Sequence, residues 1–220
     1  MFTTIILGAG KSTRMKANKS KLLFNIAGKP VINHIVKSVK DAQSRNITCV
    51  INNQSKDLKK ILVESKVEVV FQKQLDGTAG AVKSALANKN PGNSTILILC
   101  GDTPFIKGSS IKKIVNKLKS SEACIGTVEL DIPKGYGRII RTKNKISRII
   151  EEKETTLEQR QIKEVNTGVI AIKENLLRKY IGLIKNHNSK KEYYLTDIIK
   201  ILIENNHKVA TFKFTDELEI

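Results

Sequence analysis

The chain opens with a short apolar run that leads directly into a glycine-rich segment, Thr3-Thr4-Ile5-Ile6-Leu7-Gly8-Ala9-Gly10-Lys11-Ser12-Thr13-Arg14-Met15. The apolar run predicts a β-strand. Gly8 and Gly10 allow the backbone to turn sharply and to bring its N–H groups close to a ligand. Such a loop at the carboxyl end of the first strand is where nucleotides usually bind in α/β proteins. The segment therefore predicts a phosphate site to which Arg14 and Lys21 add positive charge.

Two better-known phosphate loops do not fit this segment. A Walker A loop requires a glycine five residues before its Gly-Lys-Ser sequence, but Ile5 stands at that distance from Gly10. The dinucleotide-binding fingerprint requires a third glycine where Thr13 stands. The alternative interpretation of this segment is a tight strand-to-helix turn that binds no ligand.

Composition limits the class of protein. The 220 residues are long enough to bury a substantial core as one domain. We expect no membrane segment and a cytoplasmic location, because the chain lacks both a long apolar run and a signal-peptide pattern. Cys49, Cys100 and Cys124 each lie in an apolar run and form no CxxC pair, so we expect small buried thiols in a reducing compartment.

The formal net charge of +18 favours anionic substrates such as nucleoside triphosphates and sugar phosphates. The lysines are dispersed along the chain, and no nucleic-acid-binding motif or aromatic-basic cluster accompanies them. We therefore expect no nucleic-acid partner. The histidines are also scattered, so no zinc site is predicted.

Alternating strand-like and helix-like segments predict an α/β fold with a doubly wound, mainly parallel mixed sheet. Strands are expected at residues 3–7, 48–51, 67–71, 95–100, 123–129, 137–141, 146–151, 165–172 and 209–214. Helices are expected at residues 30–43, 57–64, 111–118, 176–184 and 196–205, and a further helix is expected to begin near residue 77. Pro30 is expected in the first turn of its helix, and residues 155–163 are expected to form a polar surface segment.

Gly101 and Asp102 follow the apolar strand Thr95–Cys100, at the sheet edge where ligands bind. A carboxylate there suits Mg2+, which proteins commonly share with substrate phosphates. The alternative is that Asp102 only caps the following turn. Gln72, after the third strand, offers an amide to a base edge, and Gly77-Thr78 opens a helix whose N-terminus suits a polar or anionic group.

Together these motifs resemble a known family. Residues 7–15, followed by Lys21, Ala27-Gly28-Lys29-Pro30 and His34, are similar to the signature of nucleotidyltransferases that activate sugar 1-phosphates. Over essentially the whole chain, the sequence resembles the N-terminal uridyltransferase domain of the bacterial bifunctional N-acetylglucosamine-1-phosphate uridyltransferase/glucosamine-1-phosphate acetyltransferases. The motifs specific to that group are Gly135–Ile139, Glu158–Gln161, Glu164–Gly168 and Glu192–Asp197.

The resemblance implies a Rossmann-like nucleotidyltransferase domain over residues 1–220, with a nucleotide-binding part at about 1–108 and a small β-rich sugar-binding part at about 109–220. It implies Mg2+-dependent transfer of UMP from UTP to N-acetylglucosamine 1-phosphate. The products would be pyrophosphate and UDP-N-acetylglucosamine, a precursor for cell-wall and lipopolysaccharide synthesis.

The resemblance also implies roles for individual residues. Arg14, Lys21 and Asp102 would be catalytic, with Arg14 and Lys21 on the triphosphate and Asp102 on the metal. The nucleotide would contact Leu7, Gly8, Ala9, Gly10 and Gly101, and its uracil would be recognised by Gln72, Gly77 and Thr78. The sugar would be surrounded by Gly137, Glu151, Asn166, Tyr194 and Thr196.

The chain departs from the family pattern at several positions. Cys100 stands where the family usually has Tyr, and Ser20 where it has Pro. Gly8 replaces an Ala, which we expect to add flexibility. The chain ends at Ile220, before the family's Gly-Val-Asn segment with a second metal ligand and before its left-handed β-helix. We therefore expect no acetyltransferase activity and a less complete metal site.

Two other functions stay open at this point. One is a related nucleotidyltransferase that uses another sugar or nucleotide, although the motifs Glu192-Tyr193-Tyr194 and Asn166-Thr167-Gly168 argue against it. The other is a catalytically weak nucleotide-sugar-binding subunit, favoured by Cys100 and the missing metal ligand. The oligomeric state also stays open, and a homo-oligomer is compatible with the sequence.

Overall fold

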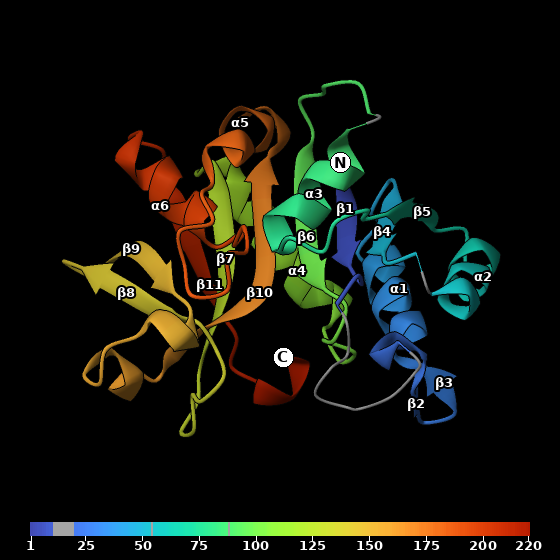
Figure 1. The fold of residues 1–220 in the computed structure, drawn as a ribbon, viewed down its shortest axis with the longest axis horizontal. Coiled ribbons are helices and arrows are strands. Elements are labelled where there is room, and N and C mark those ends of the chain that lie inside the picture. Colours follow the sequence, from blue (N-terminus) through green and yellow to red (C-terminus); the bar gives the residue numbers. More distant parts are fainter. Residues whose placement is uncertain (11–19, 54, 88) are drawn as a thin grey trace.

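The structure is a computed structural model that describes residues 1–10, 20–53, 55–87 and 89–220. A nine-stranded sheet crosses the middle of the molecule (Figure 1). Along its main path the strand order is β11-β7-β10-β6-β1-β4-β5, and β8 and β9 extend from β10 as an antiparallel pair. The predicted mixed, mainly parallel sheet is confirmed.

The strands of this sheet are β1 (Phe2–Leu7), β4 (Ile47–Ile51), β5 (Glu68–Phe71), β6 (Thr95–Cys100), β7 (Ala123–Glu129), β8 (Arg138–Thr142), β9 (Lys145–Ile150), β10 (Glu164–Lys173) and β11 (Val209–Lys213). A separate small ladder pairs β2 (Asn25–Ile26) with β3 (Lys29–Pro30). The α-helices are α1 (Val31–Asp41), α2 (Lys56–Glu64), α3 (Thr78–Leu86), α4 (Gly108–Asn116), α5 (Glu174–Tyr180) and α6 (Asp197–Glu204).

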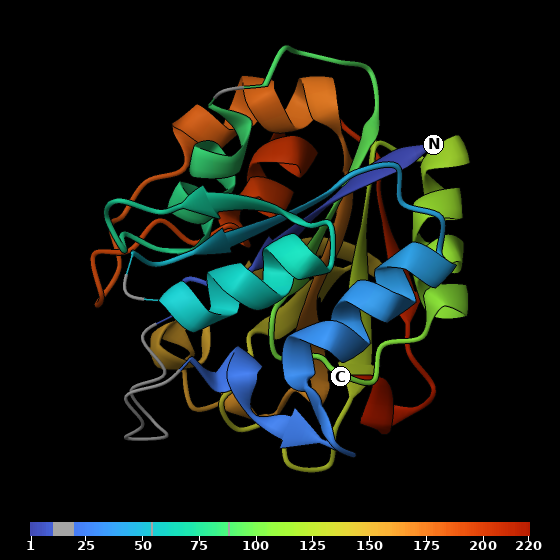
Figure 2. The same cartoon turned by 90° about the vertical axis from the view of Figure 1, so that its right-hand side faces the viewer.

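Helices cover both faces of the sheet, as a doubly wound fold requires. Buried side chains of α1, α2 and α4 pack in one core, and those of α3, α5 and α6 pack in another. Figure 2 shows α1 and α2 on one side of the strands and α5 and α6 on the other. Ile6 of β1 enters the first core and Ile5 the second, because successive strand side chains point to opposite faces. Burial on both faces explains why β1 ends in the continuous apolar run Ile5-Ile6-Leu7.

One antiparallel strand separates the two halves of the sheet. Strands β6, β1, β4 and β5 are parallel neighbours, whereas β10 runs antiparallel between β6 and β7. Because β10 comes late in the chain, residues of the second half lie beside the ends of β1 and β6. A cavity forms at this junction.

Helix boundaries differ in places from the prediction. Pro30 precedes α1 as its N-cap with an extended backbone, so the helix begins at Val31 instead of including Pro30 in its first turn. The helix ends at Asp41, because Gln43 adopts a positive φ of 66°. The helix predicted over residues 176–184 is α5 followed by a 3-10 turn, Ile181–Leu183.

The cysteines are buried to different extents. Cys49 and Cys124 are fully buried, and Cys100 at the end of β6 is half-buried. Burial raises the pKa of each thiol to about 12, so all are protonated at neutral pH. Over the described ranges, no helix is both long and apolar enough to cross a bilayer.

Candidate active site

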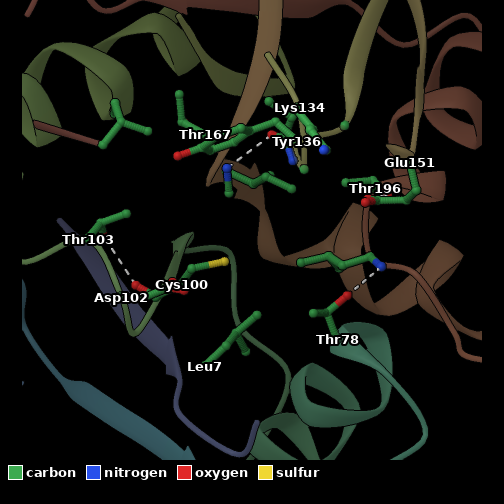
Figure 3. A pocket seen from close by; sticks show the side chains of 17 residues that line it. Leu7, Thr78, Cys100, Asp102, Thr103, Lys134, Tyr136, Glu151, Thr167 and Thr196 are labelled. Carbon is green, nitrogen blue, oxygen red and sulfur yellow. Dashed lines mark hydrogen bonds between the residues drawn. The ribbon is translucent and has the colours of Figure 1, made fainter. Parts of the chain in front are cut away.

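A cavity of about 400 Å³ opens at the carboxyl ends of β1 and β6, where they face loops from the second half of the chain. Figure 3 shows Leu7, Thr78 and Asp102 along one side and Tyr136, Glu151 and Thr196 along the other. The predicted site residues that line this cavity are Leu7, Thr78, Asp102, Gly137, Glu151, Asn166 and Thr196. Residues predicted to bind the nucleotide and residues predicted to bind the sugar therefore line the same cavity.

Backbone contacts hold the loops that follow β1 and β6. The amide of Gly101 donates to the Leu7 carbonyl oxygen at 3.0 Å, and the amide of Gly8 donates to the Val50 carbonyl oxygen at 2.7 Å. A Cβ atom on Gly8 would lie 2.8 Å from Leu22 Cδ1 and 3.1 Å from that Val50 oxygen. Glycine at position 8 thus permits close packing, and the expected gain in flexibility stays a prediction.

Lys21 and Asp102, which are 81 residues apart, form an ion pair at the cavity. Leu22 is buried and lies against both Gly8 and Gly101, which anchors the short 3-10 turn Lys21–Leu23. This packing places the Lys21 ammonium group beside the Asp102 carboxylate. The side chains are 36% and 52% exposed, so both are accessible from the solvent.

The described glycine-loop residues after Leu7 do not line the cavity. Ala9 is buried and Gly10 is exposed, and neither lines the cavity. Arg14 lies outside the described residues.

The carboxylate of Asp102 fits a site for Mg2+ that also uses substrate oxygens. Within the described part of the chain, no three His, Cys, Asp or Glu side chains gather in a way that could hold a metal ion. Asp102 presents a half-exposed carboxylate to the cavity. A hard cation that keeps waters and shares phosphate oxygens needs only one or two such protein ligands.

The loop between β5 and α3 holds the residues predicted to recognise uracil. Gln72 is buried, and its Nε2 donates to Asp76 Oδ1 at 2.9 Å and to the Gly77 carbonyl oxygen at 3.1 Å. Gln72 therefore supports the loop from beneath and does not line the cavity. Thr78 does line it, and its Oγ1 accepts a hydrogen bond of 2.9 Å from the amide of Leu195.

Two of the predicted sugar-binding residues are bonded to each other. Thr196 Oγ1 donates to Glu151 Oε1 at 2.9 Å. Burial raises the pKa of the Glu151 carboxyl, and the hydrogen bond from Thr196 opposes that shift. Glu151 thus offers the cavity an acceptor held in one orientation, which suits the hydroxyl groups of a sugar.

A β-bulge presents Asn166 to the cavity. The pairing of β10 with β7 changes register between Asn166 and Ile170, and Gly168 has a φ of +76°. The amide of Asn166 donates to the Gly137 carbonyl oxygen at 2.8 Å, and Asn166 Oδ1 accepts from the amide of Gly168 at 3.2 Å. A bulge bends a strand and redirects its side chains, which explains how Asn166 and Gly137 reach the same cavity.

Tyr194 faces a different space. It lines a second cavity of about 530 Å³ on the far side of Glu151, together with residues such as Gln159, His187 and Asp197. Burial raises the pKa of Tyr194 to about 12, with a further contribution from nearby carboxylates such as Glu192. Tyr194 is thus separated from the first cavity, and Glu151 lines both.

Several lining residues were not among the predicted site residues. These are Cys100, Thr103, Lys134, Gly135, Tyr136, Thr167, Gly168, Ile170, Leu195 and Ile220. Gly135-Tyr136 and Thr167-Gly168 stand inside the recognised motifs, so their position in those motifs could have identified them. Cys100 lies against Gly168, where a Cβ atom would be 2.6 Å from the Cys100 sulfur.

Comparison with known proteins agrees with this architecture. Residues 4–139 match the family described as MobA-like NTP transferase domain. The chain is similar to proteins named bifunctional protein GlmU from three bacteria. The protein from Buchnera aphidicola is 40% identical over 95% of this chain and 46% of its own length. Those from Caldicellulosiruptor saccharolyticus and Saccharophagus degradans are each 37% identical, over 99% and 100% of this chain and 48% and 49% of their own lengths. The chain spans about half the length of these curated relatives.

A solved structure shares the fold. It is a crystal structure described as a glucose-1-phosphate thymidylyltransferase of Bacillus anthracis, with a TM-score of 0.79 and 19% identity. The alignment covers 98% of this chain and 87% of that one.

Proposed function

This chain belongs to the family of MobA-like NTP transferase domains, and from that premise we propose that it transfers UMP from UTP to N-acetylglucosamine 1-phosphate. The products are UDP-N-acetylglucosamine and pyrophosphate. The choice of uracil and N-acetylglucosamine rests on the motifs shared with the uridyltransferase group and agrees with the GlmU relatives, which match nearly the whole chain.

The main support is the arrangement of one cavity. Leu7 and Asp102 stand at the ends of parallel strands, where an α/β sheet binds nucleotides. Gly137, Glu151 and Asn166 face them from the second half of the chain. A nucleotide and a sugar phosphate can therefore lie side by side, with their phosphates near the Lys21–Asp102 pair.

The reaction needs little covalent help from the protein. A phosphate oxygen of the sugar 1-phosphate attacks the α-phosphorus of UTP, and the bond from that phosphorus to the pyrophosphate oxygen breaks. Both pyrophosphate and the product UDP-N-acetylglucosamine leave as anions, so no side chain must accept a proton. Catalysis then depends on alignment and on neutralising phosphate charge. The protonated thiol of Cys100 is consistent with a reaction that uses no cysteine nucleophile.

In this proposal, charged residues hold the phosphates. Lys21 places a compact positive charge beside the reacting groups, and Arg14 adds a planar fork of donors for phosphate oxygens. Asp102 would hold Mg2+, which, when bound, would neutralise charge on the triphosphate. On the opposite side, the Glu151 carboxylate held by Thr196 would accept hydrogen bonds from the sugar hydroxyls.

The test is pyrophosphate release from UTP and N-acetylglucosamine 1-phosphate in the presence of Mg2+. Parallel reactions replace UTP with dTTP and the sugar phosphate with glucose 1-phosphate. We expect the highest kcat/KM for the first pair and loss of turnover when Mg2+ is removed by a chelator. A preference for another pair would assign a different transferase. Tight binding of UDP-N-acetylglucosamine without turnover of any pair would assign a binding subunit.

A further inference from the structure

We propose that Thr78 is a positioning residue for the sugar-binding side of the cavity, acting through Leu195 and Thr196. The inference rests on the proposed function. The family resemblance predicts that Thr78 recognises uracil, whereas the geometry points to a different task for its hydroxyl. The Thr78 hydroxyl connects the start of α3 to the segment that orients Glu151.

Two chain segments approach closely at this point. The amide of Tyr193 donates to the Asp76 carbonyl oxygen at 2.7 Å, and the amide of Ala79 donates to the Tyr193 carbonyl oxygen at 2.9 Å. Gly77 has a φ of +116°, and a Cβ atom there would lie 2.5 Å from the Tyr193 oxygen. Residues 76–79 and 193–195 thus pair through their backbones, and we call this pairing the clasp.

Thr78 supplies the side-chain bond of the clasp. Its Oγ1 accepts from the amide of Leu195 at 2.9 Å, and Figure 3 shows the hydroxyl directed at that nitrogen. Leu195 is 4% exposed, so water has little access to its backbone. Removing the acceptor would leave a buried N–H group unpaired, which is more costly than losing an exposed hydrogen bond.

The next residue along the chain carries this constraint to the sugar side. Thr196 follows Leu195 directly and donates to Glu151 Oε1 at 2.9 Å. Both Thr196 and Glu151 line the cavity. The start of α6 is therefore held between Thr78 on one side and Glu151 on the other. Loosening Leu195 should release Thr196, and Glu151 would then lose its fixed orientation.

The experiment compares Thr78→Val, Thr78→Ser and Ser84→Ala in the intact chain. Valine has the shape of threonine without the acceptor, and serine retains the acceptor. Ser84→Ala is the matched control, because Ser84 lies on the same helix and its hydroxyl donates to the Gly80 carbonyl oxygen within that helix. Initial rates are measured while UTP and N-acetylglucosamine 1-phosphate are varied separately.

We expect Thr78→Val to raise KM for the sugar phosphate about fivefold to tenfold, the cost of one unsatisfied buried amide. KM for UTP should change by less than about twofold, and Thr78→Ser should restore the sugar phosphate KM. A rise in the UTP KM that equals or exceeds the rise for the sugar phosphate would overturn the proposal, as would failure of Thr78→Ser to restore binding.

Amide hydrogen exchange at Leu195 provides a readout that does not depend on turnover. Protection should fall in Thr78→Val and persist in Thr78→Ser and Ser84→Ala. Equal protection in all variants would overturn the clasp even if the enzyme is active. Conversely, if the wild-type chain forms no UDP-N-acetylglucosamine, the proposed function fails, and the exchange data still decide whether Thr78 holds Leu195.

Discussion

The loops that follow β1 and β6, on the proposed nucleotide side of the cavity, are held by their backbones, whereas those on the proposed sugar side are held largely by side chains. On the nucleotide side, the amides of Gly8 and Gly101 bond directly to neighbouring strands. A Cβ atom on Gly101 would lie 2.9 Å from the Leu7 carbonyl oxygen. Glycine is required there because two backbones come within contact distance.

On the sugar side, long polar side chains connect the loops. Arg138 is 1% exposed and pairs with Glu152 at 2.8 Å. Its guanidinium also donates to the carbonyl oxygens of Tyr136 and Arg160. Nearby, Arg141 forms two hydrogen bonds with the Glu164 carboxylate, at 2.6 and 2.7 Å. The β-rich part of the domain therefore depends on specific pairs of side chains.

This difference indicates which substitutions each side of the cavity tolerates. Where two backbones are in contact, a substitution that adds a side-chain atom is expected to destabilise the loop, whereas the loss of a nearby charge is expected to have little effect. A buried ion pair resists loss of either partner, because the remaining group is left without compensation. The predictions below test this contrast, beginning with the largest effect.

The largest effect is expected from Asp102→Asn, at the nucleotide side. We expect kcat for pyrophosphate release to fall by at least about 100-fold, because a charged group that organises the phosphates is lost. The unfolding midpoint should stay near that of the wild type, since the side chain is 52% exposed. Asp57→Asn, on the exposed surface of α2, is the control. A kcat close to the wild-type value would remove Asp102 from the mechanism.

Arg138→Met should destabilise the sugar side most strongly. We expect the free energy of unfolding to fall by about 3 kcal/mol, because Glu152 and two carbonyl oxygens lose their donor. Chemical denaturation measures the change, and Arg148→Met on the exposed part of β9 serves as the control. Equal stability of the two variants would show that buried side-chain pairs do not hold this side.

Gly101→Ala and Gly137→Ala compare the two sides directly. Alanine at 101 would push against the Leu7 carbonyl oxygen, whereas at 137 the nearest atom is Ile149 Cγ2 at 3.1 Å, which can move. We expect a loss of about 2 kcal/mol for Gly101→Ala and less than about 1 kcal/mol for Gly137→Ala. The reverse order in a denaturation experiment would contradict the contrast.

The smallest expected effect is a pH dependence of stability at Glu151. Burial raises its pKa above the ordinary value of 4.5, so folding favours the protonated carboxyl. The corresponding stability is present below 4.5 and is lost as pH rises through the folded-state pKa. Glu151→Gln stays neutral and should gain stability relative to the wild type as pH rises from about 4 to 7.

Thermal unfolding of both proteins across this pH range provides the measurement. Curves that stay parallel would show that Glu151 is not penalised by burial. The same variant should bind N-acetylglucosamine 1-phosphate more weakly, because the cavity loses a charged acceptor.

Much of the fold could be predicted because the required patterns are local. Strand β6 was predicted at its observed bounds from one continuous apolar run. Gly8 was recognised because glycine permits a sharp turn and a close approach of the backbone. Gly77 and Gly101 were recognised from their places at a helix start and at the end of a buried strand. The position of Pro30 was missed by one residue, since proline suits both an N-cap and a first turn.

The sugar side was harder to predict in detail. The motif Glu164–Gly168 identified Asn166 only through the family resemblance, and the bulge that presents it depends on pairing with β7. Tyr194 stands two residues from Thr196 in the same motif, yet the two line different cavities. Neighbours in sequence can face opposite ways, so a motif alone does not say which side chains enter a site.

Local periodicity, the glycine-rich opening and the shared motifs were sufficient to establish the doubly wound fold and the family of this chain. The three-dimensional packing was needed for everything that joins distant segments. It pairs Lys21 with Asp102 and connects Thr78 to Leu195. The reason is physical, because backbone preferences are set by adjacent residues and these contacts are set by strand order. Lys21 meets Asp102 where β1 and β6 are neighbours, and Thr78 meets Leu195 because β10 enters the sheet beside β6 and brings the second half of the chain to this edge.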